Sequence, residues 1–292
     1  MSDTTTDRRL SIDDPEQTVR SVRERYGTIA RSGSSCCPPR TGCCGSGPEL
    51  VTAIGLGYTP ADLELLPDGA NLGLGCGAPI AALDLRPGET VLDLGSGAGM
   101  DAILAARAVG PLGRVIGVDM TAEMVARATR NAAAAGLANI EFREGRLESL
   151  PVDDASVDAV TSNCVINLVP DKAVVFREIH RVLRAGGRLV VADILLDGAL
   201  PAAIAADALA WAGCIAGAME RARYFTLLEE AGLRGVEVLR DIDFLAATGG
   251  DDPAELRELV AAAGFTMAEL EGVVRSVTFR ASKPTAGARS GR

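Results

Sequence analysis

The middle of the chain alternates between two hydrophobic patterns. Short apolar runs typical of buried strands occur between residues 90 and 195, at TVLDLG, RVIGVDM, IEFREG, VDAVTSN and GRLVVADIL. Between them, MDAILAARAVG, TAEMVARATRNAAAAG and DKAVVFREIHRVLRAGG carry apolar residues at helical spacing. This alternation predicts βαβ units with right-handed crossovers. We therefore expect an α/β fold with a Rossmann-like, doubly wound, mostly parallel sheet, whose ligands bind at the carboxyl ends of the strands.

The same patterns divide the chain into four parts. The first is an amphipathic helix, TVRSVRERYGTIAR, followed by the cysteine-rich loop SGSSCCPPRTGCCGSG, and the third begins where the regular alternation stops. That third part has helical segments before the strand-like runs VEVLRDIDFL and VVRSVTFRAS, and we expect it to be a smaller α/β subdomain that closes over the site and binds substrate. The expected boundaries are 1–70, 71–198 for the cofactor-binding domain, 199–283, and 284–292 for a disordered tail; residues before Asp14 are also expected to be disordered.

Composition narrows the classes of function. The chain has 292 residues, 48% of them apolar, and a formal net charge of −10. An acidic balance argues against nucleic acid or an anionic membrane as the main partner, because both require clustered Lys and Arg. No apolar run is long enough to span a bilayer, and the segment MSDTTTDRRL has no signal-peptide character. We therefore expect a cytoplasmic protein with a small-molecule substrate, whose seven cysteines are thiols, ligands or transient disulfides.

A glycine-rich turn follows the first strand-like run of the alternating region. Its polar and glycine residues are Asp93, Gly95, Ser96, Gly97, Gly99 and Asp101, and the next strand-like run ends in Asp119. Glycines at such a turn let the backbone pass close to a ligand, and a carboxylate at the second strand end suits ribose hydroxyl groups. The turn predicts a site for a nucleotide-type cofactor.

Glycine spacing alone also fits a dinucleotide site or a tight turn that binds nothing. However, the pattern is GxGxG with an acid two residues ahead, and a carboxylate there would repel a pyrophosphate. A carboxylate favours a cationic group, and the helix start near Gly97 to Met100 offers backbone N–H groups to a carboxylate. S-adenosylmethionine has a sulfonium, an ammonium and a carboxylate, so it is the cofactor that we expect.

Beyond the glycine turn, the chain resembles the class I S-adenosylmethionine-dependent methyltransferases, and in particular the arsenite methyltransferases. The segment SNCVINLVPDK is similar to a signature of that family, and GLGCGAP and WAGCIAGA resemble the surroundings of two further substrate-binding cysteines. With GVDMT and VTFRASKP, the resemblance extends from about Cys36 to Lys283. It implies a chain that methylates trivalent arsenic.

The resemblance also implies roles for individual cysteines. Cys164 and Cys214 match the pair that holds arsenic(III) next to the methyl donor, and Cys76 matches a third thiol that binds the metalloid and later enters a disulfide. A fourth family cysteine lies upstream. Its counterpart is one of the set Cys36, Cys37, Cys43 and Cys44, among which we favour Cys44.

Further residues join the expected cofactor site through the same resemblance. Met120 in GVDMT and Asn163 in SNCVINLVP match positions beside the cofactor. One departure is Arg146, which stands where many class I enzymes have an Asp that accepts a hydrogen bond from the adenine amino group. Adenine recognition would then depend on the backbone at Leu147 and on the Glu148 carboxylate.

The expected chemistry requires thiols but no general base. Arsenic(III) bound by thiolates is a neutral pyramid with a lone pair, so the protein has to position and desolvate it. After methyl transfer the arsenic is formally pentavalent, and a thiol pair such as Cys76 with an N-terminal cysteine would reduce it by forming a disulfide. Turnover would then need an external thiol reductant such as thioredoxin or glutathione.

Four other interpretations remain open at this stage. The chain could be a class I methyltransferase of a small organic molecule, or a thiol-based metalloid binder without catalytic activity. The segment CCPPRTGCC could bind zinc, although it lacks C-x₂-C spacing and an accompanying His. Each solitary cysteine could also be a small buried hydrophobe.

Overall fold

The computed structural model describes residues 14–32, 53–200, 217–244, 260–261 and 266–285. A single sheet in the order β3-β2-β1-β4-β5-β8-β7 forms its centre, and the short β6 also pairs with β5. The strands are β1 (Thr90–Leu94), β2 (Arg114–Asp119), β3 (Ile140–Glu144), β4 (Val157–Asn163), β5 (Leu183–Leu196), β6 (Met219–Glu220), β7 (Arg234–Asp243) and β8 (Val274–Ser282). Strands β1 to β5 pair in parallel, whereas β8 runs antiparallel to β5 and β7. The expected Rossmann-like, mostly parallel sheet is confirmed.

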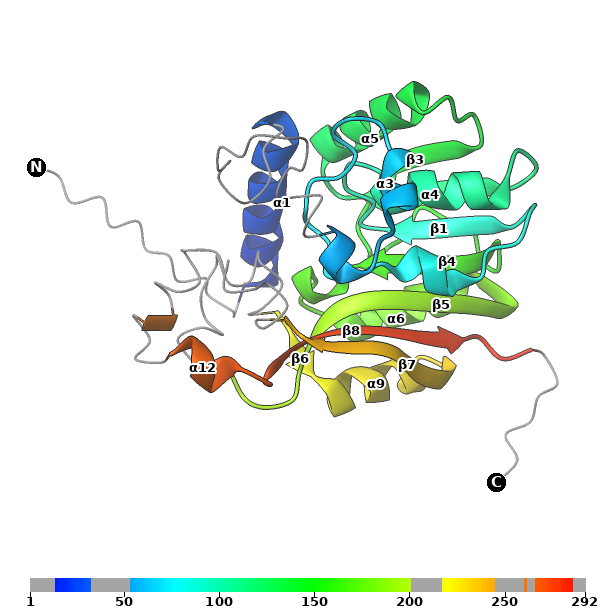
Figure 1. The fold of residues 1–292 in the computed structure, drawn as a ribbon. Helices are drawn as coiled ribbons and strands as arrows, with labels where there is room; N and C mark the ends of the chain where they lie inside the picture. Colours follow the sequence, from blue (N-terminus) through cyan, green and yellow to red (C-terminus); the bar gives the residue numbers. More distant parts are fainter. Residues whose placement is uncertain (1–13, 33–52, 201–216, 245–259, 262–265, 286–292) are drawn as a thin grey trace, which may run out of the picture.

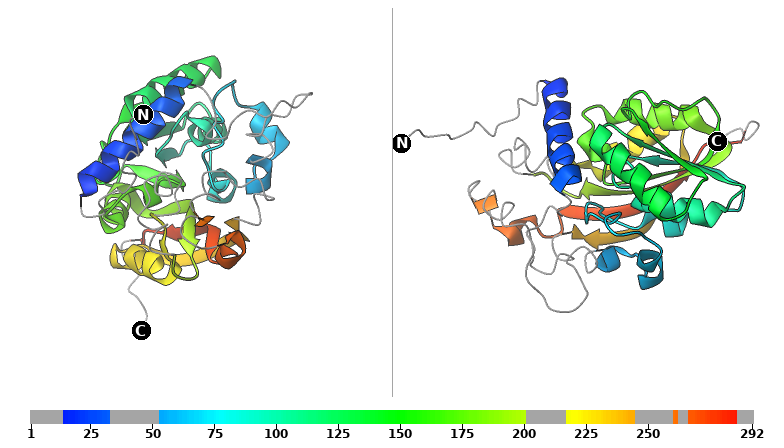
Figure 2. Two further views of the ribbon diagram at one scale, coloured as in Figure 1. Left: turned by 90° about the vertical axis from the view of Figure 1, so that its left-hand side faces the viewer. Right: turned by 90° about the horizontal axis from the view of Figure 1, so that it is seen from above.

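Helices cover both faces of this sheet (Figures 1 and 2). The helices are α1 (Pro15–Ser32), α3 (Pro60–Glu64), α4 (Met100–Val109), α5 (Ala122–Ala134), α6 (Lys172–Val182), α9 (Arg221–Glu230) and α12 (Met267–Leu270), with 3-10 turns η1 (Pro79–Leu83) and η2 (Ile166–Leu168). In β1, Leu92 and Leu94 face the core that α6 and α9 complete, whereas Val91 faces the core of α4 and η1. Both faces of the strand are therefore buried, which explains why β1 is a nearly continuous apolar run in the sequence.

The C-terminal region contributes strands to this same sheet. β8 pairs with β5 along nine residues, from Arg188 opposite Ser282 to Leu196 opposite Val274, and β7 pairs with β8 at the edge. The described strands of the expected 199–283 subdomain therefore extend the cofactor domain's sheet. The four-part division of the chain stays a prediction, and the expected helix with Cys214 lies outside the described residues, as do the expected disordered N-terminus and most of the tail.

Two elements differ in detail from the hydrophobic pattern. The segment DKAVVFREIHRVLRAGG was expected to be helical throughout, but α6 ends at Val182 and β5 begins at Leu183. Leu183 pairs with Val157 of β4, and Gly186 adopts a positive φ of 81°. Pairing with the neighbouring strand and a glycine turn thus end the helix before its apolar period ends.

Helix α1 lies across the ends at which the parallel strands finish (Figure 1). Its apolar side packs against the ends of the strands: Val22 is 1% exposed and packs in a cluster with Cys76, Cys164 and Leu168. Its polar side forms ion pairs with the sheet domain, between Arg23 and Glu144 at 2.8 Å and between Glu16 and Arg146 at 2.9 Å. The helix therefore covers the edge at which a doubly wound sheet binds its ligands.

Candidate active site

A cavity lies at the carboxyl ends of β1, β2 and β4, beneath α1. It is lined by ten of the expected cofactor-site residues: Asp93, Gly95, Ser96, Gly97, Asp101, Asp119, Met120, Leu147, Glu148 and Asn163. Cys164 and the α1 residues Val19, Val22 and Tyr26 line it too. The fold therefore brings the expected cofactor residues and one expected substrate thiol to a single cavity, while their part in binding stays a prediction.

The glycine turn needs two of its glycines for geometric reasons. Gly95 has a φ of 63°, and a Cβ there would lie 2.4 Å from the Val165 side chain. Gly99 has a φ of 93°, precedes the first residue of α4, and faces Phe142 and Ala128. Gly95 thus lets Val165 pack closely against the turn where it lines the cavity. Gly99 does not line the cavity, and its missing side chain allows close packing against Phe142 of β3 and Ala128 of α5.

Three carboxyl groups surround the head of this cavity. Asp93 is 2% exposed, and burial, followed by the charges of Asp101 and Asp119, raises its pKa well above the ordinary value. Burial also raises the pKa of Asp119, although that carboxylate accepts hydrogen bonds from the backbone N–H groups of Gly97 at 3.0 Å and Thr121 at 2.9 Å. Such a cluster is electrostatically costly without a positive partner.

The cavity fits a cationic cofactor. Within the described part of the chain, the buried Oδ2 of Asp93 and the buried Oγ of Ser96 have no hydrogen-bond partner. Unsatisfied buried polar atoms at a cavity are typical of a ligand site. A cationic ligand that accepts and donates hydrogen bonds, as S-adenosylmethionine does, would satisfy both atoms and neutralise the carboxyl cluster.

Asn163 and Tyr58 join the acidic head of the cavity to the loop that carries Cys76. The Tyr58 hydroxyl donates to Asp101 Oδ1 at 2.7 Å, and the Asn163 Nδ2 donates to Asp101 Oδ2 at 3.0 Å and to the Tyr58 oxygen at 2.9 Å. Burial and the Asp101 charge raise the Tyr58 pKa, so its hydroxyl remains a donor. Tyr58 was not expected from the sequence, because its segment GLGYTP carries only turn residues and no motif.

The expected adenine region has an unexpected ion pair. Arg146 donates to Glu148 Oε1 at 2.7 Å and to Glu16 of α1 at 2.9 Å. Leu147, which is 5% exposed, lies between the two charged residues and lines the cavity. Arg146 thus binds the Glu148 carboxylate, which was expected to contact adenine, and its second ion pair joins α1 to the cavity wall.

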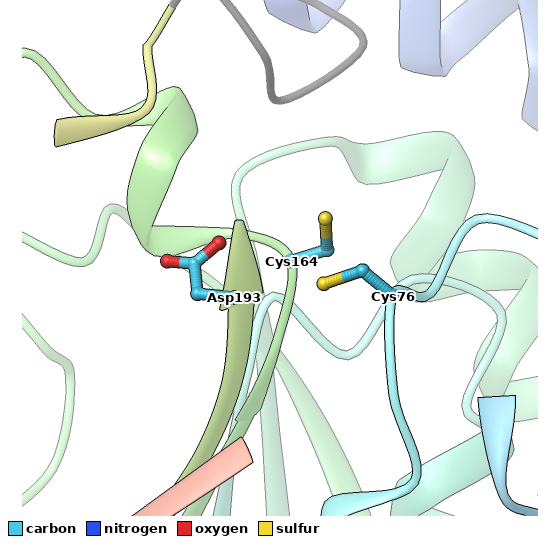
Figure 3. A group of neighbouring side chains, drawn as sticks. All are labelled: Cys76, Cys164 and Asp193. Atoms are coloured by element: carbon cyan, nitrogen blue, oxygen red, sulfur yellow. The ribbon is translucent and has the colours of Figure 1, made fainter. Parts of the chain in front are cut away.

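Two of the expected arsenic-binding thiols lie side by side (Figure 3). Cys164, directly after β4, has a φ of 60°, and its backbone N–H donates to the Ala192 carbonyl at 2.8 Å. The Cys76 thiol donates to that same carbonyl at 3.4 Å, and its backbone N–H donates to Asn163 Oδ1 at 2.9 Å. Both thiols are buried. The other expected site cysteines, Cys44 and Cys214, and the alternatives Cys36, Cys37 and Cys43 lie outside the described residues, as does the possible zinc segment.

Asp193 is a third buried group beside these thiols. Its carboxylate and the sulfur atoms of Cys76 and Cys164 each lie within 4.8 Å of one another. The Tyr224 hydroxyl donates to Asp193 Oδ2 at 2.9 Å, and burial raises the Asp193 pKa to about 7. The sequence signal for Asp193 was its position inside the apolar run LVVADILL, because an acidic residue in a buried strand is rarely found without a partner.

Among the helices of the described residues, none is long and apolar enough to cross a membrane.

Comparison with known proteins places the chain in a family. Residues 85–232 match the family model described as a methyltransferase domain. The arsenite methyltransferase of Halobacterium salinarum is 47% identical over 232 residues, which are 77% of this chain and 59% of that protein. The human arsenite methyltransferase is 36% identical over 141 residues, which are 45% of this chain and 38% of that protein. The chain thus spans less than two thirds of the length of the curated relatives that it matches.

A solved structure agrees with these relatives. The crystal structure of an arsenic(III) S-adenosylmethionine methyltransferase from Chlamydomonas reinhardtii superposes with a TM-score of 0.60 and 32% sequence identity. The match covers 86% of this chain and 76% of that one. The acidic cavity, the adjacent thiols and these similarities all point to the same family. The chain belongs to the arsenite methyltransferases, a family of class I S-adenosylmethionine-dependent methyltransferases.

Proposed function

We propose that this chain transfers a methyl group from S-adenosylmethionine to trivalent arsenic held by cysteine thiolates. The observation that carries the proposal is the position of Cys164, whose buried thiol lines the same cavity as Asp93, Asp101 and Asp119. The relatives named as arsenite methyltransferases support the choice of substrate. We expect the activity in the cytoplasm, where a reducing environment keeps the thiols available.

The residues of the cavity divide the task between them. Asp93 and Asp101 would hold the cationic end of the cofactor, the N–H groups near Gly97 its carboxylate, and Asp119 its ribose. The cofactor supplies an electrophilic methyl group when it is bound. Helix α1, through Val19, Val22 and Tyr26, closes the cavity and excludes water from the reaction.

The thiols hold the other reactant. We infer that Cys164 and Cys214 bind arsenic next to the methyl donor and that Cys76, whose sulfur lies within 4.8 Å of that of Cys164, provides a third sulfur. Each thiol loses its proton to a hydroxyl group of arsenous acid, which leaves as water. The bound arsenic keeps its lone pair, so proximity and orientation, without a general base, provide the rate enhancement.

The product must be reduced before another cycle. Methyl transfer uses the arsenic lone pair and leaves arsenic formally pentavalent. We infer that Cys76 and an N-terminal cysteine, favoured here as Cys44, return two electrons to arsenic and form a disulfide. A glutathione- or thioredoxin-type thiol then reduces that disulfide by exchange.

The test is an assay of purified protein with arsenite, S-adenosylmethionine and thiol, with arsenic speciated by chromatography and mass spectrometry. We expect methylated arsenic from the natural chain and none from Cys164→Ser or Cys214→Ser, both of which should still bind the cofactor. Cofactor turnover without any dependence on arsenite would instead indicate an organic substrate. Tight arsenite binding without a methylated product would indicate a metalloid binder.

A further inference from the structure

Two thiols and one carboxylate converge at the end of the sheet, from three separate segments. Cys76 comes from the loop before η1, Cys164 from the turn after β4, and Asp193 from β5. Their sulfur and oxygen atoms all lie within 4.8 Å of one another, and all three residues are buried (Figure 3). The Cys76 sulfur points into the space between the other two side chains. The sequence resemblance assigned the thiols to arsenic and gave Asp193 no role.

We propose that Cys76, Cys164 and Asp193 form a binding site for a divalent cation of the zinc group. A mixed set of thiolate and carboxylate ligands suits such ions, which accept both sulfur and oxygen. With bonds of about 2.0–2.3 Å, donor atoms around a tetrahedral ion lie about 3–4 Å apart. Since the donor atoms lie within 4.8 Å of one another, each pair needs to approach by at most about 1–2 Å, a shift that side-chain rotations provide.

Surrounding hydrogen bonds orient two of the three ligands, Asp193 and Cys76, before any ion binds. The Tyr224 hydroxyl and the Ile194 backbone N–H donate to the two oxygens of Asp193, at 2.9 Å and 3.1 Å. The backbone of Cys76 is held on both sides, because its N–H donates to Asn163 and its carbonyl accepts from the Ser276 hydroxyl. Hydrogen bonds of this kind to the ligands are a regular feature of protein metal sites.

The charge of the site is also suited to a divalent cation. On binding, each thiol releases its proton to solvent, so two thiolates and one carboxylate face the two positive charges of the ion. The remaining negative charge is offset by the buried Lys172, whose ammonium group stabilises the Asp193 carboxylate. Three protein ligands leave the fourth tetrahedral position for water or a further thiol.

Arsenite and the cation would share Cys76 and Cys164, so they would compete. Asp193 distinguishes cation binding from arsenite binding, because a carboxylate oxygen is a regular ligand of zinc-group ions and has no assigned part in holding arsenic. Cation binding itself does not rest on the proposed methylation.

The experiment uses Cd²⁺ as the probe, because its thiolate complexes absorb in the ultraviolet. The full chain carries Cys36→Ser, Cys37→Ser, Cys43→Ser, Cys44→Ser and Cys214→Ser, so that Cys76 and Cys164 are the remaining thiols. Titration followed by absorption and calorimetry should show one Cd²⁺ bound per chain. Adding Asp193→Asn should weaken binding at least about tenfold, whereas the control Asp197→Asn, whose carboxylate pairs with Arg221, should not change it.

Absence of thiolate-to-cadmium absorption in this variant, or equal affinity with and without Asp193→Asn, would overturn the site. If circular dichroism shows that the five-serine variant is unfolded, the natural chain is compared with its Cys76→Ser/Cys164→Ser variant by the same titration. Loss of one bound Cd²⁺ supports the site, and an unchanged number overturns it. Neither titration contains arsenite or cofactor, so its failure and a failure of arsenic methylation are distinguishable.

Discussion

The side-chain oxygen of Asn163 accepts a hydrogen bond from the backbone N–H of Cys76 at 2.9 Å. The nitrogen of the same amide donates to Asp101 at 3.0 Å and to the Gly77 carbonyl at 2.8 Å. One side chain at the end of β4 thus holds both an acidic group of the cavity and the loop that carries Cys76.

Replacing this amide should therefore impair both sides of the site. We expect Asn163→Ala to lower cofactor affinity and arsenite kcat/KM by about tenfold or more each, because lost buried hydrogen bonds cost about 1–3 kcal/mol. Calorimetry and the methylation assay measure the two effects. The control Asn139→Ala removes an amide that caps carbonyls of Ala106 and Gly110, so it should lower stability alone. If Asn163→Ala lowered neither cofactor affinity nor arsenite kcat/KM, the proposed role of this amide in positioning both sides of the site would be wrong.

Asp93 should make cofactor binding depend on pH. In the free protein, burial and two neighbouring carboxyl groups raise the pKa of Asp93 well above its ordinary value. A bound cation favours the ionised form, so binding releases a proton, and affinity should fall as the pH is lowered through the raised pKa. We expect Asp93→Asn to weaken S-adenosylmethionine binding about 10- to 100-fold and to flatten this pH dependence, as measured by calorimetry in several buffers.

The raised pKa of Asp93 affects the stability of the cofactor-free protein with the opposite pH dependence: cofactor affinity should rise with pH, whereas stability should fall. A raised folded-state pKa means that the fold binds the proton more tightly than the unfolded chain, so the contribution of Asp93 to stability falls as the pH rises from the unfolded value towards the folded one. Without cofactor, Asp93→Asn should then raise the unfolding temperature at neutral pH. The control Asp171→Asn, at the start of α6 where Asn caps equally well, should change neither property. A lower unfolding temperature for Asp93→Asn would contradict the assignment.

Cys164 occupies a backbone conformation that suits glycine better than an L-residue. At a φ of 60°, the left-handed region costs a residue with a Cβ about 1–2 kcal/mol. Cys164→Gly should therefore be more stable than Cys164→Ala by about 1 kcal/mol in urea unfolding, although both should lose arsenic methylation. In the exposed interior of α5, Ala126→Gly should destabilise by about 1 kcal/mol. A more stable alanine variant at position 164 would remove the strain argument.

Helix α1 should be held over the cavity by its apolar side more than by its ion pairs. Val22→Asp places a carboxylate in a cluster with both thiols, and the cost of burying that charge should detach the helix and weaken cofactor binding by more than tenfold. Glu16→Gln removes an exposed ion pair with Arg146, which contributes at most about 1 kcal/mol, so affinity should fall at most about fivefold. Fluorescence-detected titration of the two variants gives the order, and a larger effect for Glu16→Gln would reverse this interpretation.

Local patterns were sufficient to predict the parallel part of the sheet. Alternating apolar runs identified β1 to β5, and the acid-glycine turn identified the cavity at their carboxyl ends. The order in which β7 and β8 join the sheet could not be read in the same way. β8 pairs antiparallel with β5 across about 80 residues of chain, and no local period carries that information.

The candidate site shows the same division between local and distant information. Asp93 and Asp119 were expected, because each follows from a strand end beside a motif. Tyr58 and Asp193 were not, because their roles depend on partners more than 30 residues away in sequence: Tyr58 donates to Asp101 and Asp193 accepts from Tyr224. Polar pairs between residues far apart in sequence form only in the folded chain, so they produce no recognisable spacing pattern in the sequence.

The hydrogen bond from Ser276 to the Cys76 carbonyl joins residues that are 200 positions apart. The ribosome makes Cys76 long before it makes β8, so the nascent chain carries the Cys76 carbonyl without the hydroxyl group that binds it. This hydrogen bond forms only after the last strand has inserted between β5 and β7, so a chain that stops before β8 would lack it.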